Sequence, residues 1–246
     1  IYCYTDSIIS EKIFLEKFEK DELDFITSFL RTGDQFIDIG AHIGLYSIYA
    51  AKIVGEGGNV ISFEPTPSTY SKLSENIALN NFTQVETHQK AVSKTDGQLD
   101  FYMIKNGYEA WNSPAPPSKN EPFEKITVSA VQIDKLSQLN IDFNEAVLVK
   151  IDIEGWELDT LRGGKKRLSR DSAPTLMIEF TDENAKNAGS TCKELYKYLE
   201  ELGYKLYQYN RKKGKLMNSP LKDSYPYENL IAVKNTDFVN KRLQEN

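Results

Sequence analysis

The sequence predicts an α/β fold in which helices cover both faces of a seven-stranded, mostly parallel sheet. Strand-like and helix-like segments alternate through the first 80 residues. Later in the chain, residues 147–151 form an apolar run that only Lys150 interrupts, as expected of a strand buried on both faces of a parallel sheet. Sheets of this kind bind ligands at the carboxyl ends of their strands, so the residues that follow each strand are the functional candidates.

The first element is a helix over residues 18–31, whose apolar residues recur on one helical face and which Gly33 ends. We expect it to flank the first strand, as part of an N-terminal extension that covers residues 1–34.

The first strand and its turn, residues 36–47, are expected to organise the fold. Gly40 lets the backbone turn sharply off the strand, and Gly44 lets the next helix approach the sheet closely. The spacing departs from the dinucleotide fingerprint because His42 stands where a glycine would make room for a pyrophosphate. We therefore expect a nucleoside ligand without phosphates.

The second strand, residues 59–63, ends in Glu64, twenty positions after Gly44. An acid at this position can accept hydrogen bonds from two ribose hydroxyls. The next helix is expected over residues 67–80, and a weaker strand over residues 84–91.

Two strand-like runs, residues 99–104 and 126–131, enclose a segment rich in Pro, Asn and Ser. This segment, residues 105–123, contains Tyr108 and Trp111, whose aromatic faces suit sugar rings or flat acyl groups. It is our candidate substrate loop. The alternative of an ordinary variable surface loop remains equally open.

Carboxylates follow several predicted strands. Asp152 and Glu154 follow strand 147–151, and Glu179 lies at the end of strand 174–180. We expect Asp38, Glu64, Asp152 and Glu179 at one edge of the sheet, where four carboxylates exceed what packing requires. The chain then continues with a helix over residues 193–202, strands over 204–209 and 229–233, and a polar tail over 236–246. The basic run 211–215 is interpreted as a solvated hairpin loop rather than a phosphate site.

Four of these segments resemble the FkbM-type methyltransferases: residues 36–44, Phe63-Glu64-Pro65, the run 148–157 with Lys-Ile-Asp-x-Glu-Gly at its centre, and residues 176–179. The resemblance extends from about Phe18 to Tyr209. It implies the class I Rossmann-like methyltransferase fold over residues 35–235, S-adenosylmethionine (AdoMet) as cofactor, and O-methylation of a sugar, glycan or secondary metabolite.

The cofactor can be assigned to residues of this sequence. We expect its carboxylate at the amides of Ala41, His42 and Ile43, its ammonium near Asp38, and its ribose at Glu64. In the resembled family the stretch after the third strand borders the adenine, which implies residues 88–91. The predicted cofactor-binding residues are Asp38, Gly40, Ala41, His42, Gly44, Glu64, Pro65 and Ala91.

Methyl transfer to a hydroxyl requires that its proton be drawn away. Asp152 is the first candidate for the general base and Glu154 the second. Alternatively, Asp152 and Glu179 hold a hard divalent ion that polarises the hydroxyl, although no metal-ligand motif assigns one. In a third reading Asp152 only caps the following helix, while Glu154 and Glu157 favour its first turn.

The composition of the chain limits the classes of binding partner to be expected. A net charge of −6 and a pI near 5.2 argue against nucleic acids and anionic membranes. We expect a small-molecule or saccharide substrate, and leave the oligomeric state open. Two isolated cysteines, no apolar run of membrane-spanning length and no signal-peptide pattern predict a cytoplasmic location, although a chain without an initial Met can be a fragment.

Two rival functions remain. An NAD-dependent oxidoreductase also uses an acid-ended second strand, although His42 and the missing middle glycine count against it. A module that binds AdoMet without turnover would keep the same cofactor residues. Motifs for lipase-type hydrolases, P-loop NTPases and zincins do not occur in the sequence.

Overall fold

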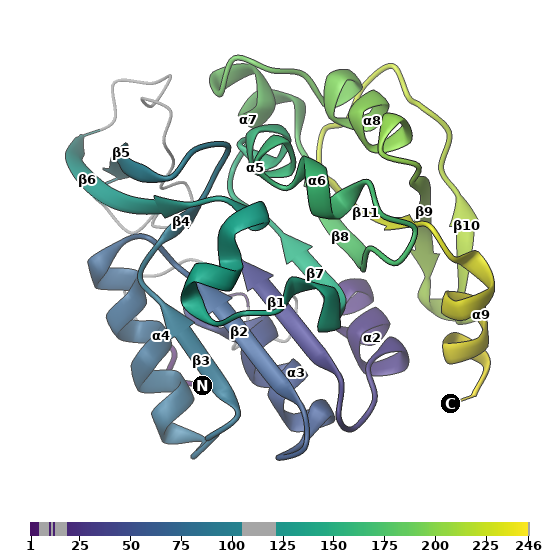
Figure 1. Ribbon diagram of the computed structural model, residues 1–246, viewed down its shortest axis with the longest axis horizontal. Coiled ribbons are helices and arrows are strands. Elements are labelled where there is room, and N and C mark those ends of the chain that lie inside the picture. The colour runs from purple at the N-terminus through teal and green to yellow at the C-terminus, as the bar shows by residue number, and fades with distance from the viewer. Residues whose placement is uncertain (5–9, 11, 13–18, 105–121, 246) are drawn as a thin grey trace.

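The computed structural model of the chain describes residues 1–4, 10, 12, 19–104 and 122–245, and shows a central sheet between two layers of helices (Figure 1). The helices are α2 (Lys20–Phe29), α3 (Leu45–Val54), α4 (Pro67–Leu79), α5 (Glu157–Gly163), α6 (Lys165–Leu168), α7 (Asp182–Asn187), α8 (Cys192–Glu201) and α9 (Thr236–Gln244), with 3₁₀ helices η2 (Ile133–Leu139), η3 (Phe143–Glu145) and η4 (Arg211–Lys213). The strands are β1 (Gln35–Ile39), β2 (Asn59–Phe63), β3 (Val85–His88), β4 (Ala91–Val92), β5 (Gly97–Ile104), β6 (Phe123–Val131), β7 (Ala146–Ile151), β8 (Thr175–Phe180), β9 (Lys205–Asn210), β10 (Lys215–Asn218) and β11 (Glu228–Val233).

The main sheet has the strand order β10-β9-β11-β8-β7-β1-β2-β3. Strands β3, β2, β1, β7 and β8 run parallel, and β11 is antiparallel to both β8 and β9. The carboxyl ends of β1, β2 and β7 are in register, because Ile39 pairs with both Phe63 and Ile151. The residues that follow these strands therefore meet at one edge of the sheet.

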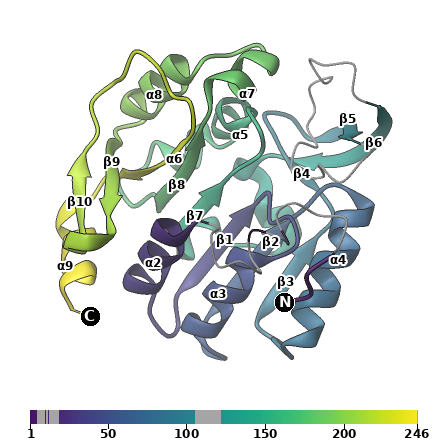
Figure 2. The same cartoon turned by 180° about the vertical axis from the view of Figure 1, so that it is seen from behind.

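Helices cover both faces of this sheet, as the views from the front and from behind show (Figures 1 and 2). Since side chains alternate along a strand, Ile37 and Ile39 of β1 join one core and Phe36 joins the other. The first core packs against α5, α6, α8 and η2, and the second against α2, α3 and α9. The predicted fold class is confirmed.

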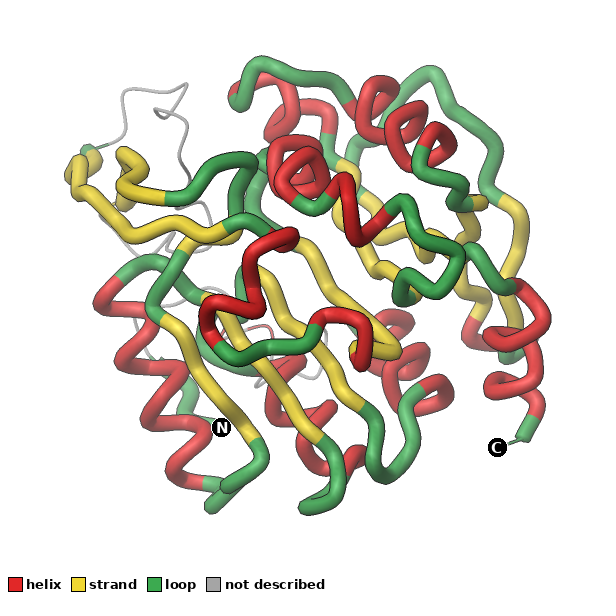
Figure 3. Tube along the Cα trace, viewed as in Figure 1, coloured by secondary structure: helices red, strands yellow, loops and turns green. Residues whose placement is uncertain are grey.

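A second sheet, whose strands lie in the order β4-β6-β5, is found beyond the tips of β1–β3 (Figure 3). Strand β6 pairs in parallel with β4 and antiparallel with β5. Strands were expected at both β5 and β6, but as part of the main sheet. The weak strand expected over 84–91 also ends early, at His88, and its last residue begins β4.

Two further differences concern the C-terminal part. Strand β10 pairs with β9 and makes the main sheet eight-stranded, so the run 211–215 is the connection of a hairpin, as predicted. The segment expected as a polar tail instead forms α9. Its buried residues, Val239 and Leu243, are four positions apart and pack on the second core.

The candidate substrate loop, with Tyr108 and Trp111, falls on residues 105–121, which lie outside the described residues, apart from its last two positions. In the described part of the chain, no helix combines the length and apolarity needed to cross a bilayer.

Candidate active site

A pocket that is partly open to solvent lies at the carboxyl edge of the main sheet. Both sheets build it: the turns after β1, β2 and β7 form one side, and Leu99 and Phe101 of β5 form the other. The lining residues are Ile39, Gly40, His42, Phe63, Glu64, Pro65, Lys90, Ala91, Val92, Ser93, Leu99, Phe101, Asp152, Ile153, Glu154 and Trp156.

The turn after β1 depends on glycine. Gly40 has φ +84°, and a Cβ at this position would collide with the backbone oxygen of Asp152. The turn consequently lies directly against the chain after β7.

The turn also changes one expectation. The amides of Ala41 and His42 were predicted to be free for the cofactor carboxylate, but Ala41 donates to the carbonyl of Phe63 (2.9 Å) and His42 donates to Glu64 (3.2 Å). This part of the prediction is wrong. The physical reason is that the turn at Gly40 places these amides against the end of β2, where they already donate hydrogen bonds within the protein.

Glu64 is held rigidly at the end of β2. Its Oε1 accepts hydrogen bonds from the backbone N–H (3.0 Å) and the hydroxyl (2.5 Å) of Thr66, and its Oε2 accepts the N–H of His42. Burial raises the pKa of Glu64, and the three donors oppose that shift. The carboxylate is thus fixed in place while it still lines the pocket.

Asp38 lies beneath the turn rather than in the pocket lining. It is fully buried, and its Oδ2 accepts a hydrogen bond from Ser47 (2.6 Å), whose hydroxyl is 2.8 Å from that of Ser62. Burial raises its pKa, whereas the charge of Lys150 lowers it. Asp38 therefore connects β1 to α3.

Two buried polar groups of the pocket lack partners among the described residues. Neither ring nitrogen of His42 has a hydrogen-bond partner, nor has the indole Nε1 of Trp156. Burial lowers the pKa of His42 to about 4, so its ring is neutral at physiological pH. Unsatisfied buried donors and acceptors are costly, and a polar ligand in this pocket would satisfy them.

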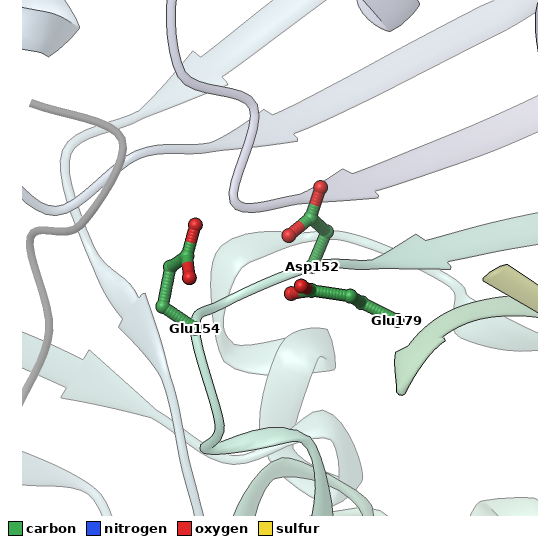
Figure 4. A group of neighbouring side chains, drawn as sticks. All are labelled: Asp152, Glu154 and Glu179. Carbon is green, nitrogen blue, oxygen red and sulfur yellow. The ribbon is translucent and has the colours of Figure 1, made fainter. Parts of the chain in front are cut away.

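Acids from β7 and β8 form the other half of the site. Figure 4 shows Asp152 beside Glu179, with Glu154 on the same stretch of chain as Asp152. The nearest carboxylate oxygens of these three residues all lie within 4.8 Å of one another. Lys150 Nζ is 2.9 Å from Asp152 Oδ2 and 4.5 Å from the ring centre of Tyr46.

The electrostatics of these acids differ. Burial opposes ionisation of Asp152, but the charge of Lys150 together with hydrogen bonds from Glu179 and Lys150 lowers the pKa of Asp152. Burial, followed by the charge of Asp152, raises the pKa values of Glu154 and Glu179 well above their usual range. Among the described residues, Lys150 forms its ion pair with one of the three acids, Asp152.

In the described part of the chain, no side chain caps helix α5, and Glu157 instead holds the turn that precedes the helix. Its Oε1 accepts the N–H groups of Ile153 (3.0 Å) and Gly155 (3.2 Å), whereas the described hydrogen bond of Asp152 is to Lys150. The reading in which Asp152 serves as this cap is therefore wrong. Burial raises the pKa of Glu157 to about 7.

Most of the predicted site residues meet in one place. Those that line the pocket are Gly40, His42, Glu64, Pro65, Ala91, Asp152 and Glu154. Asp38, Ala41 and Gly44 lie outside its lining and support the turn. Sequence reasoning missed Trp156 and Phe101 as pocket residues. It also treated Lys150 only as an interruption, although a lysine within a buried apolar strand was itself a signal for a charge partner.

The model of the methyltransferase FkbM domain matches residues 38–206. Methyltransferase 1 of Beauveria bassiana is 30% identical over 147 residues, which are 53% of this chain and 58% of that protein. The hexuronic acid methyltransferase AglP of Haloferax volcanii is 26% identical over 187 residues, 74% of this chain and 68% of that one.

Among solved structures, a methyltransferase FkbM from Methylobacillus flagellatus KT aligns with a TM-score of 0.50 at 15% identity, over 85% of this chain and 48% of that chain. This likeness concerns the fold alone. The matches to the Beauveria protein and to methyltransferase sdnD of Sordaria araneosa span less than two thirds of those relatives, 58% and 59%.

Proposed function

Because the chain belongs to the FkbM methyltransferase family, we propose that it transfers a methyl group from AdoMet to a hydroxyl of a sugar, glycan or secondary metabolite. One observation carries the proposal: a single pocket has Glu64 at one end and Asp152 with Glu154 at the other. Glu64 can accept hydrogen bonds from the hydroxyls of a ribose. Asp152 and Glu154 can accept the proton of the acceptor hydroxyl. The name of the 26% identical Haloferax relative supports a saccharide acceptor.

The pocket fits the cofactor in three respects. The carboxylate of Glu64 is fixed where it can bind a ribose diol, the turn at Gly40 lines the pocket, and nitrogens of His42 and Trp156 have no partner among the described residues. Pro65 and Ala91 provide apolar surface for the base. AdoMet, when bound, supplies an activated methyl group on a sulfonium.

The residues of the chain then have three tasks. Leu99 and Phe101 of the second sheet give one side of the pocket an apolar surface, which limits the access of water to the methyl group and favours its transfer to the acceptor over hydrolysis. Asp152, whose pKa is lowered, is ionised and accepts the hydroxyl proton. Glu154 lies next to it and orients the acceptor by hydrogen bonding.

The test combines binding and turnover. Calorimetry should show micromolar binding of AdoMet or S-adenosylhomocysteine, and heat with NADH but none with AdoMet would contradict the proposal. Labelled AdoMet is then incubated with nucleotide sugars, free sugars and glycans. A chain that binds AdoMet but labels no member of a broad panel would instead be a binding module without turnover.

A further inference from the structure

The cluster formed by Asp152, Glu154 and Glu179 has more acceptors than the surrounding protein satisfies. Asp152 accepts one hydrogen bond from Lys150, and Glu154 accepts one from Asn184 Nδ2 (2.5 Å). Glu179 accepts one, from Thr181 Oγ1 (2.6 Å). An ionised carboxylate offers about four acceptor sites, so most of those in the cluster remain open.

One oxygen of the cluster is both buried and unpaired. Glu179 is 5% exposed, and its Oε2 has no hydrogen-bond donor among the described residues. Figure 4 shows its carboxylate turned toward Asp152. Two buried carboxyl groups that face each other need either a shared proton or a cation between them.

The cluster has fewer cationic partners than acids. Among the described residues, Lys150 is the cation paired with it, with its Nζ 2.9 Å from Asp152 Oδ2. Glu154 and Glu179 accept their hydrogen bonds from an amide and a hydroxyl, which carry no charge. Two of the three acids therefore have no cationic partner in the described part of the chain.

We propose that Asp152, Glu154 and Glu179 bind one hard divalent cation, of the Mg²⁺ or Mn²⁺ class, at the edge of the pocket. A site made only of carboxylate oxygens selects such ions over softer metals. The oxygens lie within 4.8 Å of one another, close to the roughly 4.2 Å that separates opposite ligands of an ion bound at about 2.1 Å. A small inward movement of the side chains completes the site.

The position of the ion suggests its task. Asp152 and Glu154 line the pocket, whereas Glu179 lies behind them, so an ion among the three faces the ligand. An acceptor hydroxyl that coordinates it becomes more acidic, and its oxygen is held in one place. This role rests on the proposed function, whereas binding of the ion does not.

Binding is tested with Mn²⁺ and the full chain after treatment with a chelator. Free Mn²⁺ gives a six-line electron paramagnetic resonance signal that disappears on binding. The wild-type chain should remove one equivalent of this signal. Glu179→Gln and Glu154→Gln should each weaken Mn²⁺ binding at least about tenfold. Glu201→Gln, on an exposed position of α8, should bind as the wild type does.

Circular dichroism identifies any variant that fails to fold, and the other variant then decides. Absence of a saturable Mn²⁺ site in the wild-type chain, or equal affinity in the folded glutamine variants, would overturn the proposal. AdoMet calorimetry on the same samples separates the two ideas. Heat with AdoMet but no Mn²⁺ site contradicts only the metal, and a Mn²⁺ site without AdoMet heat contradicts only the proposed function.

Discussion

Glu64 and Glu179 are both buried glutamates at the edge of one parallel sheet, yet their surroundings are opposite. Glu64 accepts three hydrogen bonds, two of them from backbone amides, and both of its oxygens are occupied. Glu179 accepts one, and its other oxygen faces Asp152 without a donor. The β2 end of the pocket is thus completed by the protein, whereas the β7–β8 end is left incomplete.

The difference indicates a division of labour. A carboxylate fixed by backbone donors presents the same geometry to every ligand, as binding of an invariant cofactor requires. Acids that repel one another hold free energy that a proton, a cation or a substrate can release. We therefore assign recognition to the β2 end and chemistry to the β7–β8 end.

The sharpest test of this division is Asp152→Asn. Methyl transfer should fall about 10²–10⁴-fold, because the amide neither accepts the proton nor retains the charge. AdoMet affinity should change little. Labelled-methyl transfer and calorimetry on one preparation measure both quantities. A variant that methylates at the wild-type rate would reduce Asp152 to a structural residue.

The next largest effect is expected at Lys150. Lys150→Met keeps most of the side-chain volume but leaves Asp152 without its ion-pair partner in a buried setting. The free energy of unfolding should fall by about 3–5 kcal/mol in a urea titration. Lys94→Met, which removes an exposed partner of Asp159, serves as the control and should change stability little. Equal losses of unfolding free energy in the two variants would mean that the ion pair between Lys150 and Asp152 stabilises the fold no more than an exposed one does.

Glu64→Ala tests the other end of the pocket. The dissociation constant of AdoMet should rise about 10–100-fold, because one charged hydrogen-bonding group is worth about 1.5–3 kcal/mol. Glu75→Ala, on an exposed position of α4, is the matched control. If both variants bind AdoMet equally well in calorimetry, Glu64 does not hold the ribose.

The smallest effect concerns pH. Burial raises the pKa of Glu157 to about 7, so between about pH 4.5 and 7 the folded chain retains a proton that the unfolded chain releases. The contribution of Glu157 to stability is therefore present below this window and is lost as pH rises through it. Glu157→Gln should flatten the slope of unfolding free energy by up to about 1.4 kcal/mol per pH unit. Chemical denaturation at several pH values measures the slope, and identical slopes would argue against a raised pKa.

Much of the fold follows from local patterns. Apolar runs ended by acids identify β1, β2, β7 and β8, and the two glycines identify the turn before α3. These signals are contained in a few adjacent residues. Helix α9 was not predicted, because only Val239 and Leu243 are buried in an otherwise polar segment. Two apolar residues give too weak a pattern to distinguish a helix from a polar tail.

The site is predictable in part for the same reason. Residues that follow parallel strands must meet at one edge, so Glu64, Asp152 and Glu154 could be placed together. What could not be predicted depends on distant contacts. The approach of Phe101 to the pocket requires the second sheet, and the occupation of the Ala41 and His42 amides requires the exact register of β1 beside β2.

The close approach of Gly40 to the carbonyl of Asp152 has a consequence for attempts to redesign the protein. Since any side chain at position 40 would displace the backbone that carries Asp152, the turn after β1 fixes the position of that acid. Variant libraries that aim at new methyl acceptors should therefore keep Gly40 and Asp152 unchanged. They should vary β5 instead, because Leu99 and Phe101 line the pocket on its other side.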